Sequence, residues 1–374
     1  MMTTDRVGLY LHVPFCVRKC NYCDFCSFNM SSVDWRDEYI DRLCEEILSY
    51  KGKEIKINSI FFGGGTPSLL TAEEFERIVS TIRSTFCVLP DTEFTVEANP
   101  RTLDKQKLSA FVKHGVNRLS IGLQSVHENE LKILGRIHNY EEFCDSYNLA
   151  RQCGIDNINV DLMYGIPEQT MDSFRETLAT ILALKPEHIS LYGLILEEGT
   201  LFFEKQGDLN LPCEDLECDM YYLACDMLRD NGYSHYEISN YALPGRECRH
   251  NLKYWRSQEY IGVGLSAYSY FDEKRYGNVD DPREYFHKKS VKYDQIESID
   301  YAKSQYEYVM LRLRLAEGFS LIDYKERFGV DFLLGREDII SRLMSAGYIN
   351  IVDDRIFLTE MGFYISNSII NEFI

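Results

Sequence analysis

The stretch Leu9-Tyr-Leu-His-Val-Pro-Phe-Cys16-Val-Arg-Lys-Cys20-Asn-Tyr-Cys23 joins a short apolar run to three closely spaced cysteines. Residues 9–13 predict a buried β-strand, so the cysteines follow directly on a strand end. Such a compact loop can bind three corners of a 4Fe–4S cluster, because these clusters are held by cysteine thiolates. The fourth iron is then left for an outside ligand. A structural zinc ion, which usually takes four protein ligands, is the alternative, and His12 or Cys26 could complete its set.

Short β-branched runs alternate with longer amphipathic stretches from residue 7 to about 235. The predicted strands are residues 9–13, 58–62, 93–97, 118–121, 157–162 and 188–191, and the predicted helices are 33–50, 72–86, 103–114, 139–153 and 170–184. This alternation predicts an α/β fold with a parallel sheet and crossover helices. The units suit either a partial (β/α)6 barrel, related to the TIM barrel, or a doubly wound sheet, and periodicity does not choose between them.

Residues that can bind ligands stand at the ends of these predicted strands. Cys16 follows the first strand, residues 63–65 are three glycines after the second, and Glu97 ends the third. Gln124 follows the fourth strand, and Asp161 lies near the end of the fifth. The carboxyl ends of parallel strands converge on one mouth, where such folds bind ligands. We therefore expect these residues to share one site.

Two further segments follow the predicted barrel domain, which we place at residues 1–235. Residues 236–300 form an extension with short strands and glycine-rich turns, and residues 301–374 form a separate module. In that module, helices near 303–315, 320–328 and 335–345 precede a hairpin of 348–352 and 356–358, which predicts a winged-helix-like domain. Winged helices commonly bind DNA. However, the predicted third helix balances two arginines with two acids, so we favour docking of a protein or ligand.

The bulk composition narrows the class of protein. A net charge of −19 and a pI near 4.9 disfavour nucleic acid as a partner, because phosphate binding needs a basic surface. No apolar run approaches the length of a membrane span, and no secretory signal is evident, so we predict a cytoplasmic protein without an integral membrane segment. Of the remaining cysteines, Cys44, Cys87, Cys144 and Cys153 are predicted to be small buried hydrophobes.

The cysteine loop resembles the CxxxCxxC signature of the radical S-adenosylmethionine (SAM) superfamily. In that superfamily the amino and carboxylate groups of SAM chelate the open iron, and reduction of the cluster cleaves SAM to a 5′-deoxyadenosyl radical. The resemblance narrows to the oxygen-independent coproporphyrinogen III oxidase group. It rests on Tyr10-Leu-His-Val-Pro-Phe-Cys16, Phe62-Gly-Gly-Gly-Thr-Pro-Ser68, Glu97-Ala-Asn-Pro100, Arg118-Leu-Ser-Ile-Gly-Leu-Gln-Ser125, Leu134-Gly-Arg-Ile-His138 and Asp161.

The resemblance implies a set of site residues. It assigns the cluster to the loop cysteines, Cys16, Cys20 and Cys23. It assigns SAM to residues at the strand ends: Tyr10, Gly64, Gly65, Thr66, Glu97, Gln124, Arg136 and Asp161. Plainer alternatives are that the glycines form a tight turn, that Glu97 is a solvated strand end, that Arg136 is an exposed helix residue, and that Tyr10 packs in the core. No catalytic residue is assigned.

Two branches of the group differ in features that this sequence displays. The coproporphyrinogen dehydrogenase has a fourth cysteine two residues after the third, where this chain has Phe25, and Cys26 lies one residue outside that register. His250-Asn-Leu-Lys-Tyr254-Trp255 resembles the HNxxYW motif of the HemW haem chaperones. Neutral imidazole is a standard axial ligand of haem iron, so His250 is a candidate haem ligand. Cys248 is a rival ligand, and a satisfied polar cluster is the plain alternative.

The resemblance therefore favours a haem chaperone that binds haem and transfers it to acceptor haemoproteins. It would carry a 4Fe–4S cluster and SAM, and it would need an electron donor for the cluster. Whether the protein is an enzyme stays open. The enzyme alternatives are the oxygen-independent coproporphyrinogen III dehydrogenase, which converts its substrate to protoporphyrinogen IX by oxidative decarboxylation, and a radical SAM methyltransferase.

Overall fold

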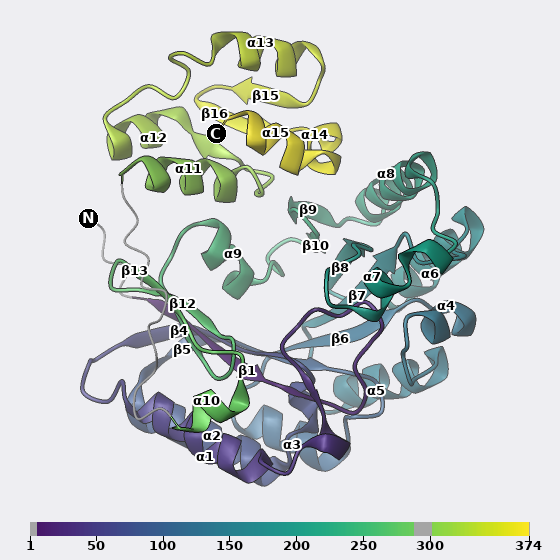
Figure 1. Ribbon diagram of the computed structural model, residues 1–374, viewed down its shortest axis with the longest axis vertical. Helices are drawn as coiled ribbons and strands as arrows, with labels where there is room; N and C mark the ends of the chain where they lie inside the picture. The colour runs from purple at the N-terminus through teal and green to yellow at the C-terminus, as the bar shows by residue number, and fades with distance from the viewer. Residues whose placement is uncertain (1–5, 288–300, 374) are drawn as a thin grey trace.

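One large open sheet organises the chain. The computed structural model describes residues 6–287 and 301–373. Within them, eleven strands pair in the order β13-β12-β11-β1-β4-β5-β6-β7-β8-β10-β9 (Figure 1). Six consecutive strands of this order are parallel. They are β1 (Val7–Val13), β4 (Lys56–Gly64), β5 (Cys87–Ala98), β6 (Arg118–Gln124), β7 (Ile158–Tyr164) and β8 (His188–Gly193).

The strand order distinguishes between the two predicted architectures. From β1 to β8 the strands follow one another without the reversal that marks a doubly wound sheet, so the order is that of a barrel. The sheet does not close on itself, since β13 and β9 lie at its two edges. The α/β class and the partial barrel are therefore confirmed.

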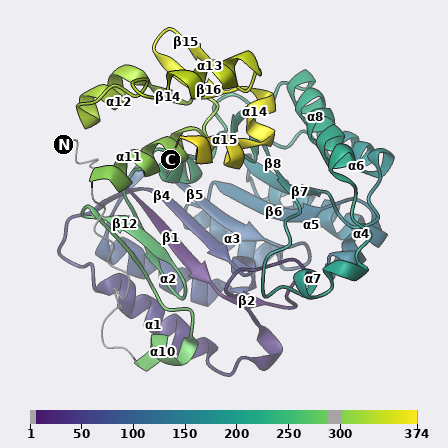
Figure 2. The ribbon, with the colours of Figure 1, turned by 45° about the horizontal axis from the view of Figure 1, so that its top comes forward.

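The crossover helices cover one face of this sheet (Figure 2). They are α1 (Arg36–Leu48), α2 (Ala72–Thr85), α3 (Lys105–Lys113), α4 (Glu128–Ile133), α5 (Tyr140–Gln152), α6 (Met171–Leu184) and α8 (Glu214–Asp230). Capping boxes fix the starts of α2, α5 and α6, which satisfies backbone N–H groups that would otherwise lack partners. Alternate strand residues such as Leu9, Leu11 and Val13 are buried. Their neighbours Tyr10 and His12 project to the opposite face, because side chains alternate along a strand.

The cysteine expectation is only partly correct. Cys44 on α1 is buried, and Cys144 and Cys153 are half-buried. Cys87 is exposed, so the expectation is wrong there. It is the first residue of β5, where the strand begins at the surface. Shorter elements lie among the main ones: β2 (Phe15–Cys16), β3 (Phe28–Asn29), α7 (Leu201–Glu204) and 3-10 turns at Met30–Ser32, Pro67–Leu69 and Gln206–Asp208.

The chain after β8 extends the sheet at both edges. Strands β9 (Ser234–Glu237) and β10 (Asn240–Ala242) form a hairpin antiparallel to β8. The helix α9 (Arg249–Trp255) then crosses to the other side, where β11 (Tyr260–Val263) pairs parallel with β1. Strands β12 (Tyr268–Phe271) and β13 (Lys274–Gly277) and α10 (Pro282–His287) follow. The predicted extension ends in residues outside the described ranges, and the three-part division stays a prediction.

The last segment folds as a small module beside the barrel (Figure 1). Its elements are α11 (Tyr301–Arg312), β14 (Phe319–Ser320), α12 (Leu321–Phe328), α13 (Glu337–Ser345), β15 (Ile349–Val352), β16 (Arg355–Leu358), α14 (Glu360–Tyr364) and α15 (Ser366–Glu372). The three strands pair in the order β14-β16-β15, as in a winged helix, around buried Tyr308, Phe319, Tyr324 and Phe332.

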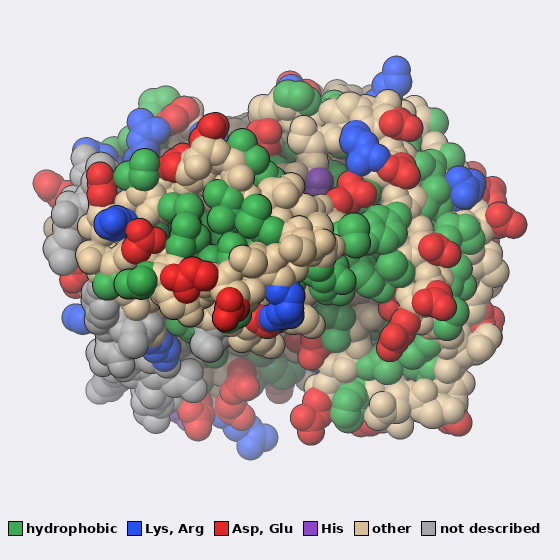
Figure 3. Space-filling view, turned by 90° about the horizontal axis from the view of Figure 1, so that it is seen from above, with side chains coloured by type: hydrophobic (Ala, Val, Ile, Leu, Met, Phe, Trp, Pro, Cys, Tyr) green, Lys and Arg blue, Asp and Glu red, His purple; other side chains and the backbone are tan. Residues whose placement is uncertain are grey.

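The surface of this module mixes charges of both signs. Figure 3 views the molecule from this side and shows acidic, basic and apolar side chains interspersed. On α13, Arg342 pairs with Glu372 of α15, so an acid already neutralises the one arginine within that helix. Among the described residues, no helix is both long enough and apolar enough to cross a membrane.

Candidate functional site

A cavity of about 240 Å³ opens on the face of the sheet opposite the crossover helices. Its walls are built from alternate residues of neighbouring strands, since Glu97 of β5 stands beside Ser120 of β6, which stands beside Asn159 of β7. Five predicted site residues line it, namely Tyr10, Gly64, Glu97, Asp161 and His250. The strand-end prediction therefore brings distant parts of the sequence into one place.

The three loop cysteines lie at the carboxyl end of β1. Cys16 is buried, and Cys20 and Cys23 are half-buried, all as free thiols. The Thr66 hydroxyl donates to Cys16 Sγ at 3.7 Å, and Arg136 Nη1 donates to Cys20 Sγ at 3.4 Å. Donors aimed at sulfur stabilise thiolates, as around iron–sulfur clusters. The donor set thus fits a cluster with three thiolate ligands.

Burial raises the pKa of Cys16 and raises that of Cys23 to about 11. Both thiols are therefore protonated at neutral pH when no cation is near, and binding of iron would release their protons. The zinc alternative fares less well. His12, its candidate fourth ligand, bonds Tyr10 Oη through Nδ1 at 3.1 Å and the Cys26 carbonyl through Nε2 at 2.7 Å. In the described ranges, no three His, Cys, Asp or Glu side chains, the loop cysteines included, are placed to hold a single metal ion, so this observation does not separate a cluster from zinc.

The glycines after β4 pack closely against the end of β1. Gly64 has φ +105°, and a Cβ there would lie 2.5 Å from the His12 ring. A Cβ on Gly65 would lie 2.7 Å from the Phe15 carbonyl oxygen. Only glycine fits at either position. The tight-turn interpretation and the cofactor interpretation are thus compatible, because the same turn presents the backbone of Gly64 to the cavity.

Two carboxyl groups face this cavity. Glu97 Oε2 accepts from the Gly64 backbone N–H at 3.2 Å. Asp161 accepts from Asn159 Nδ2 at 2.7 Å and from the Ser120 hydroxyl at 3.4 Å. Burial, together with the charge of Asp161, raises the pKa of Glu97 to about 8, and burial raises the pKa of Asp161. A cationic ligand in the cavity would favour the charged form of both groups.

Arg136 and Gln124 lie beside the cavity rather than on its walls. Arg136 follows α4 in a loop, and its Nη2 donates to the Gly122 carbonyl and to Asn99 Oδ1, both at 2.5 Å. The alternative of an exposed helix residue is therefore wrong. Gln124 ends β6 with φ +77° and is buried. Such a backbone conformation is strained for a residue other than glycine and is frequent at ligand sites.

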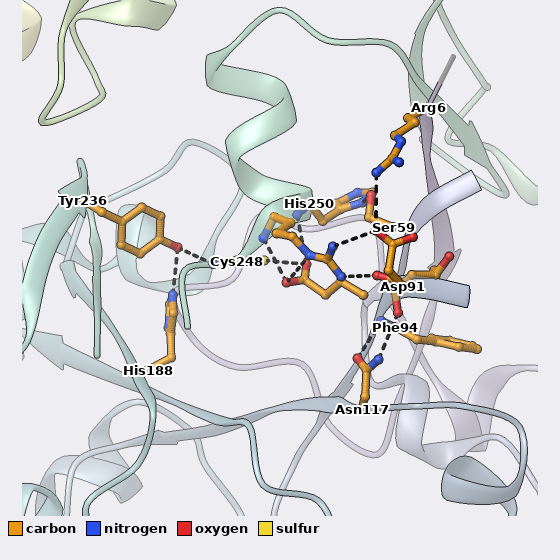
Figure 4. A network of polar contacts seen from close by, with 12 residues as sticks. Arg6, Ser59, Asp91, Phe94, Asn117, His188, Tyr236, Cys248 and His250 are labelled. Carbon is orange, nitrogen blue, oxygen red and sulfur yellow. Dashed lines mark hydrogen bonds and ion pairs between the residues drawn. The ribbon is translucent and has the colours of Figure 1, made fainter. Parts of the chain in front are cut away.

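His250 lies at the end of the cavity away from the cysteine loop. It is 1% exposed, and its ring stacks on Phe61 at 5.2 Å. Its Nδ1 bonds the Ser59 hydroxyl at 2.9 Å (Figure 4). Its Nε2 bonds Tyr254 Oη, also at 2.9 Å. Burial lowers the pKa of His250 to about 3, so the imidazole is neutral. His250 is thus part of a satisfied polar cluster, and it also has the neutral form that can bind a metal ion.

The amino end of α9 is held by β5. The Glu93 carboxylate accepts from the backbone N–H groups of Arg249 at 3.0 Å and His250 at 2.9 Å. Cys248 Sγ donates to the same carboxylate at 3.6 Å, and its backbone N–H donates to Tyr236 Oη at 3.1 Å (Figure 4). Cys248 is fully buried. The helix that carries His250 is thus fixed at both of its first residues.

Several wall residues had no role in the sequence prediction. Besides Arg118, they include polar groups of β6, β7 and β8: Ser120, Asn159, Ser190 and Tyr192. A signal existed. These residues stand at alternate positions of strands whose other face is apolar and buried, and polar side chains on such a face point to a buried site.

Two family descriptions match the chain: the radical SAM superfamily over residues 10–181 and the HemN C-terminal domain over residues 305–365. The haem chaperone HemW of Lactococcus lactis is 36% identical over 368 residues, which cover 98% of this chain and 96% of that protein. HemW of Bacillus subtilis is 33% identical over 375 residues, with 98% of each chain covered. HemW of Escherichia coli is 33% identical over 387 residues and covers both chains fully.

Among solved structures, the coproporphyrinogen III oxidase HemN of Escherichia coli, described as a radical SAM enzyme, superposes with a TM-score of 0.86. The match covers 100% of this chain and 91% of that one, at 22% identity. This likeness shows that the two chains share a fold.

Proposed function

We propose, because this chain belongs to the HemW family of the radical SAM superfamily, that it binds haem and transfers it to acceptor haemoproteins. The observation that carries the proposal is identity of 33–36% with proteins named haem chaperone HemW along nearly the whole length of both chains. The position of His250, Tyr254 and Asn251 on the cavity wall supports a ligand-binding role for the HNxxYW segment.

Membership of the superfamily implies a 4Fe–4S cluster and SAM. We assign the cluster to Cys16, Cys20 and Cys23, whose sulfurs receive hydrogen bonds from Thr66 and Arg136. When bound, the cluster and SAM supply one-electron reductive chemistry, which requires an electron donor. The cavity gives SAM a polar glycine turn at one end and two acids, Glu97 and Asp161, beside it. Ionised carboxylates at this depth would stabilise its sulfonium charge.

Haem contact is assigned to His250 and the aromatic residues around it. The imidazole is neutral, which is the form that ligates haem iron. Its Nε2 is engaged by Tyr254 Oη, so axial ligation requires this hydroxyl to move aside. Phe61 and Tyr10 offer flat apolar surface near the ring. The alternative function, coproporphyrinogen III dehydrogenase, has the shared fold in its favour, and a single experiment tests both.

The test uses the full chain with its cluster reconstituted anaerobically. Haem titration and release of CO2 from coproporphyrinogen III are measured on the same sample. We expect a stoichiometric Soret band, weakened in His250→Ala, and no decarboxylation. His235→Ala is the matched control, because His235 is a half-buried histidine that packs between Tyr241 and Phe363, away from the cavity lining. Sustained CO2 release without haem binding would refute the chaperone function.

A further inference from the structure

Arg118 is a buried cation on the cavity wall whose side chain forms no hydrogen bond or ion pair with the described residues, although Glu93 and Asp161 attract it electrostatically. It is the first residue of β6, is 2% exposed and is the largest fully buried side chain of the described residues. Its Nε is buried without a hydrogen-bond partner. Within residues 6–287 and 301–373, its guanidinium takes part in no ion pair or hydrogen bond, although it lines the cavity. A buried unpaired charge is costly, and such a group requires an explanation.

Two acids that interact electrostatically with Arg118, Glu93 and Asp161, already accept hydrogen bonds from other donors. Glu93 accepts from two backbone N–H groups of α9. Asp161 accepts from Asn159 and Ser120. Neither forms an ion pair with the guanidinium, so the protein does not itself satisfy the donors of Arg118. They stay available to a molecule that enters the cavity.

The register of the sheet fixes the depth of this group. Arg118 stands beside Thr95, whereas Glu97 stands beside Ser120. Arg118 therefore lies two residues, or about 7 Å along the strand, from the level of Glu97 toward α9. The glycine turn and the cysteine loop lie at the opposite end. A ligand that reaches Arg118 must extend past the two acids into the part of the cavity that His250 borders.

We infer that Arg118 is a carboxylate-binding residue for a ligand in this cavity. The planar guanidinium fork matches a carboxylate with two parallel hydrogen bonds. The inference deepens the proposed function and rests on it for the identity of the ligand, because the two organic ligands proposed for this cavity, SAM and haem, both carry carboxylates. The chemistry is shared, and the source is decided by the test below.

The test compares Arg118→Met with Arg151→Met in the cluster-reconstituted protein. Arg151 is the matched control, because it lies on α5, outside the cavity lining, and pairs with Glu187 at 2.8 Å and with Tyr147. Thermal unfolding is measured without ligand. We expect Arg118→Met to unfold near the wild-type temperature, because it breaks no hydrogen bond or ion pair with the described residues and the lost attraction to Glu93 and Asp161 is offset by removal of a buried charge. Arg151→Met should unfold at a lower temperature, because it breaks existing contacts.

Dissociation constants are then measured for four probes: haem, haem dimethyl ester, SAM and decarboxylated SAM. We expect Arg118→Met to bind one of the two acids about 10- to 100-fold more weakly and its carboxylate-free counterpart as wild type does. Arg118→Lys should fall between, since it keeps the charge and loses the fork. A loss confined to haem identifies a propionate, and a loss confined to SAM identifies the methionyl carboxylate.

Wild-type affinity of Arg118→Met for all four probes would overturn the inference and assign the free donors to water. A lowered unfolding temperature of Arg118→Met without ligand, with unchanged affinities, would also overturn it in favour of a structural role. If the wild-type protein itself binds no haem, the proposed function fails, while the SAM arm still tests Arg118.

Discussion

The Glu93 carboxylate anchors the amino end of α9, and its replacement tests whether this contact fixes the helix that carries His250. The side chain is 5% exposed, and its two hydrogen bonds to backbone N–H groups measure 3.0 and 2.9 Å. In Glu93→Gln, one acceptor oxygen becomes an amide nitrogen that faces a backbone donor. Loss of one hydrogen bond to a charged group, with its buried partner left unsatisfied, costs about 2 kcal/mol.

We expect this loss of free energy to weaken α9 alone, so the assay is amide hydrogen exchange of residues 249–255. If α9 opens as a unit, 2 kcal/mol corresponds to exchange that is about 30-fold faster. Asp91→Asn is the matched control, because Asp91 lies two residues earlier on β5 and faces Arg249 at 4.0 Å, but is 57% exposed. Such a surface pair contributes little. Equal exchange in the two variants would refute the anchoring role of Glu93.

Two further predictions concern the strand-end groups. Because the pKa of Glu97 is raised to about 8, the folded chain keeps a proton on Glu97 that the unfolded chain releases above about pH 4.5. Proton binding by Glu97 therefore stabilises the folded chain at low pH, and this stabilisation is lost as the pH rises to 8. Denaturant unfolding at pH 6, 7 and 8 should show that the free energy of unfolding falls by about 1 kcal/mol less per pH unit in Glu97→Gln than in the wild type. The same pH dependence in both proteins would contradict this. Arg136→Gln removes a donor to Cys20, so redox titration should give a cluster potential lower by about 60 mV, with exposed Lys132→Gln unchanged.

The sequence was sufficient for the barrel because its strands are buried on the helix-facing side. Residues 9–13, 58–62 and 188–191 lie within β1, β4 and β8. Parallel strands of this kind read as β-branched runs between amphipathic helices, and the strand ends then place their residues at one mouth. The winged-helix-like module followed from the same periodicities. These predictions depend only on local pattern and on the rule that parallel strands need crossovers.

The part of the site around His250 and Arg118 depends on contacts between residues far apart in the sequence, which no local pattern contains. The position of α9 is set by Glu93, more than 150 residues earlier in the chain. The strands on either side of α9 join opposite edges of the sheet, which periodicity does not predict. Arg118 begins the motif of residues 118–125. That its guanidinium lacks a hydrogen-bond partner among the described residues is evident only once the hydrogen bonds of Asp161 and Glu93 to other donors are known.

The arrangement of α9 bears on how two ligands share one cavity. His250 and Tyr254 border the same space as Glu97 and Asp161. At about 240 Å³ this space is below the 300–1,000 Å³ usual for one drug-sized ligand, so under the proposed function a haem in contact with His250 would have to displace part of the wall that α9 forms. Such a displacement would be opposed by the hydrogen bond from His250 to Ser59 and by the two N–H groups that Glu93 holds. Because the same cavity is also bordered by Glu97, such a displacement by haem would change the free energy with which SAM binds, and by reciprocity SAM would change that of haem.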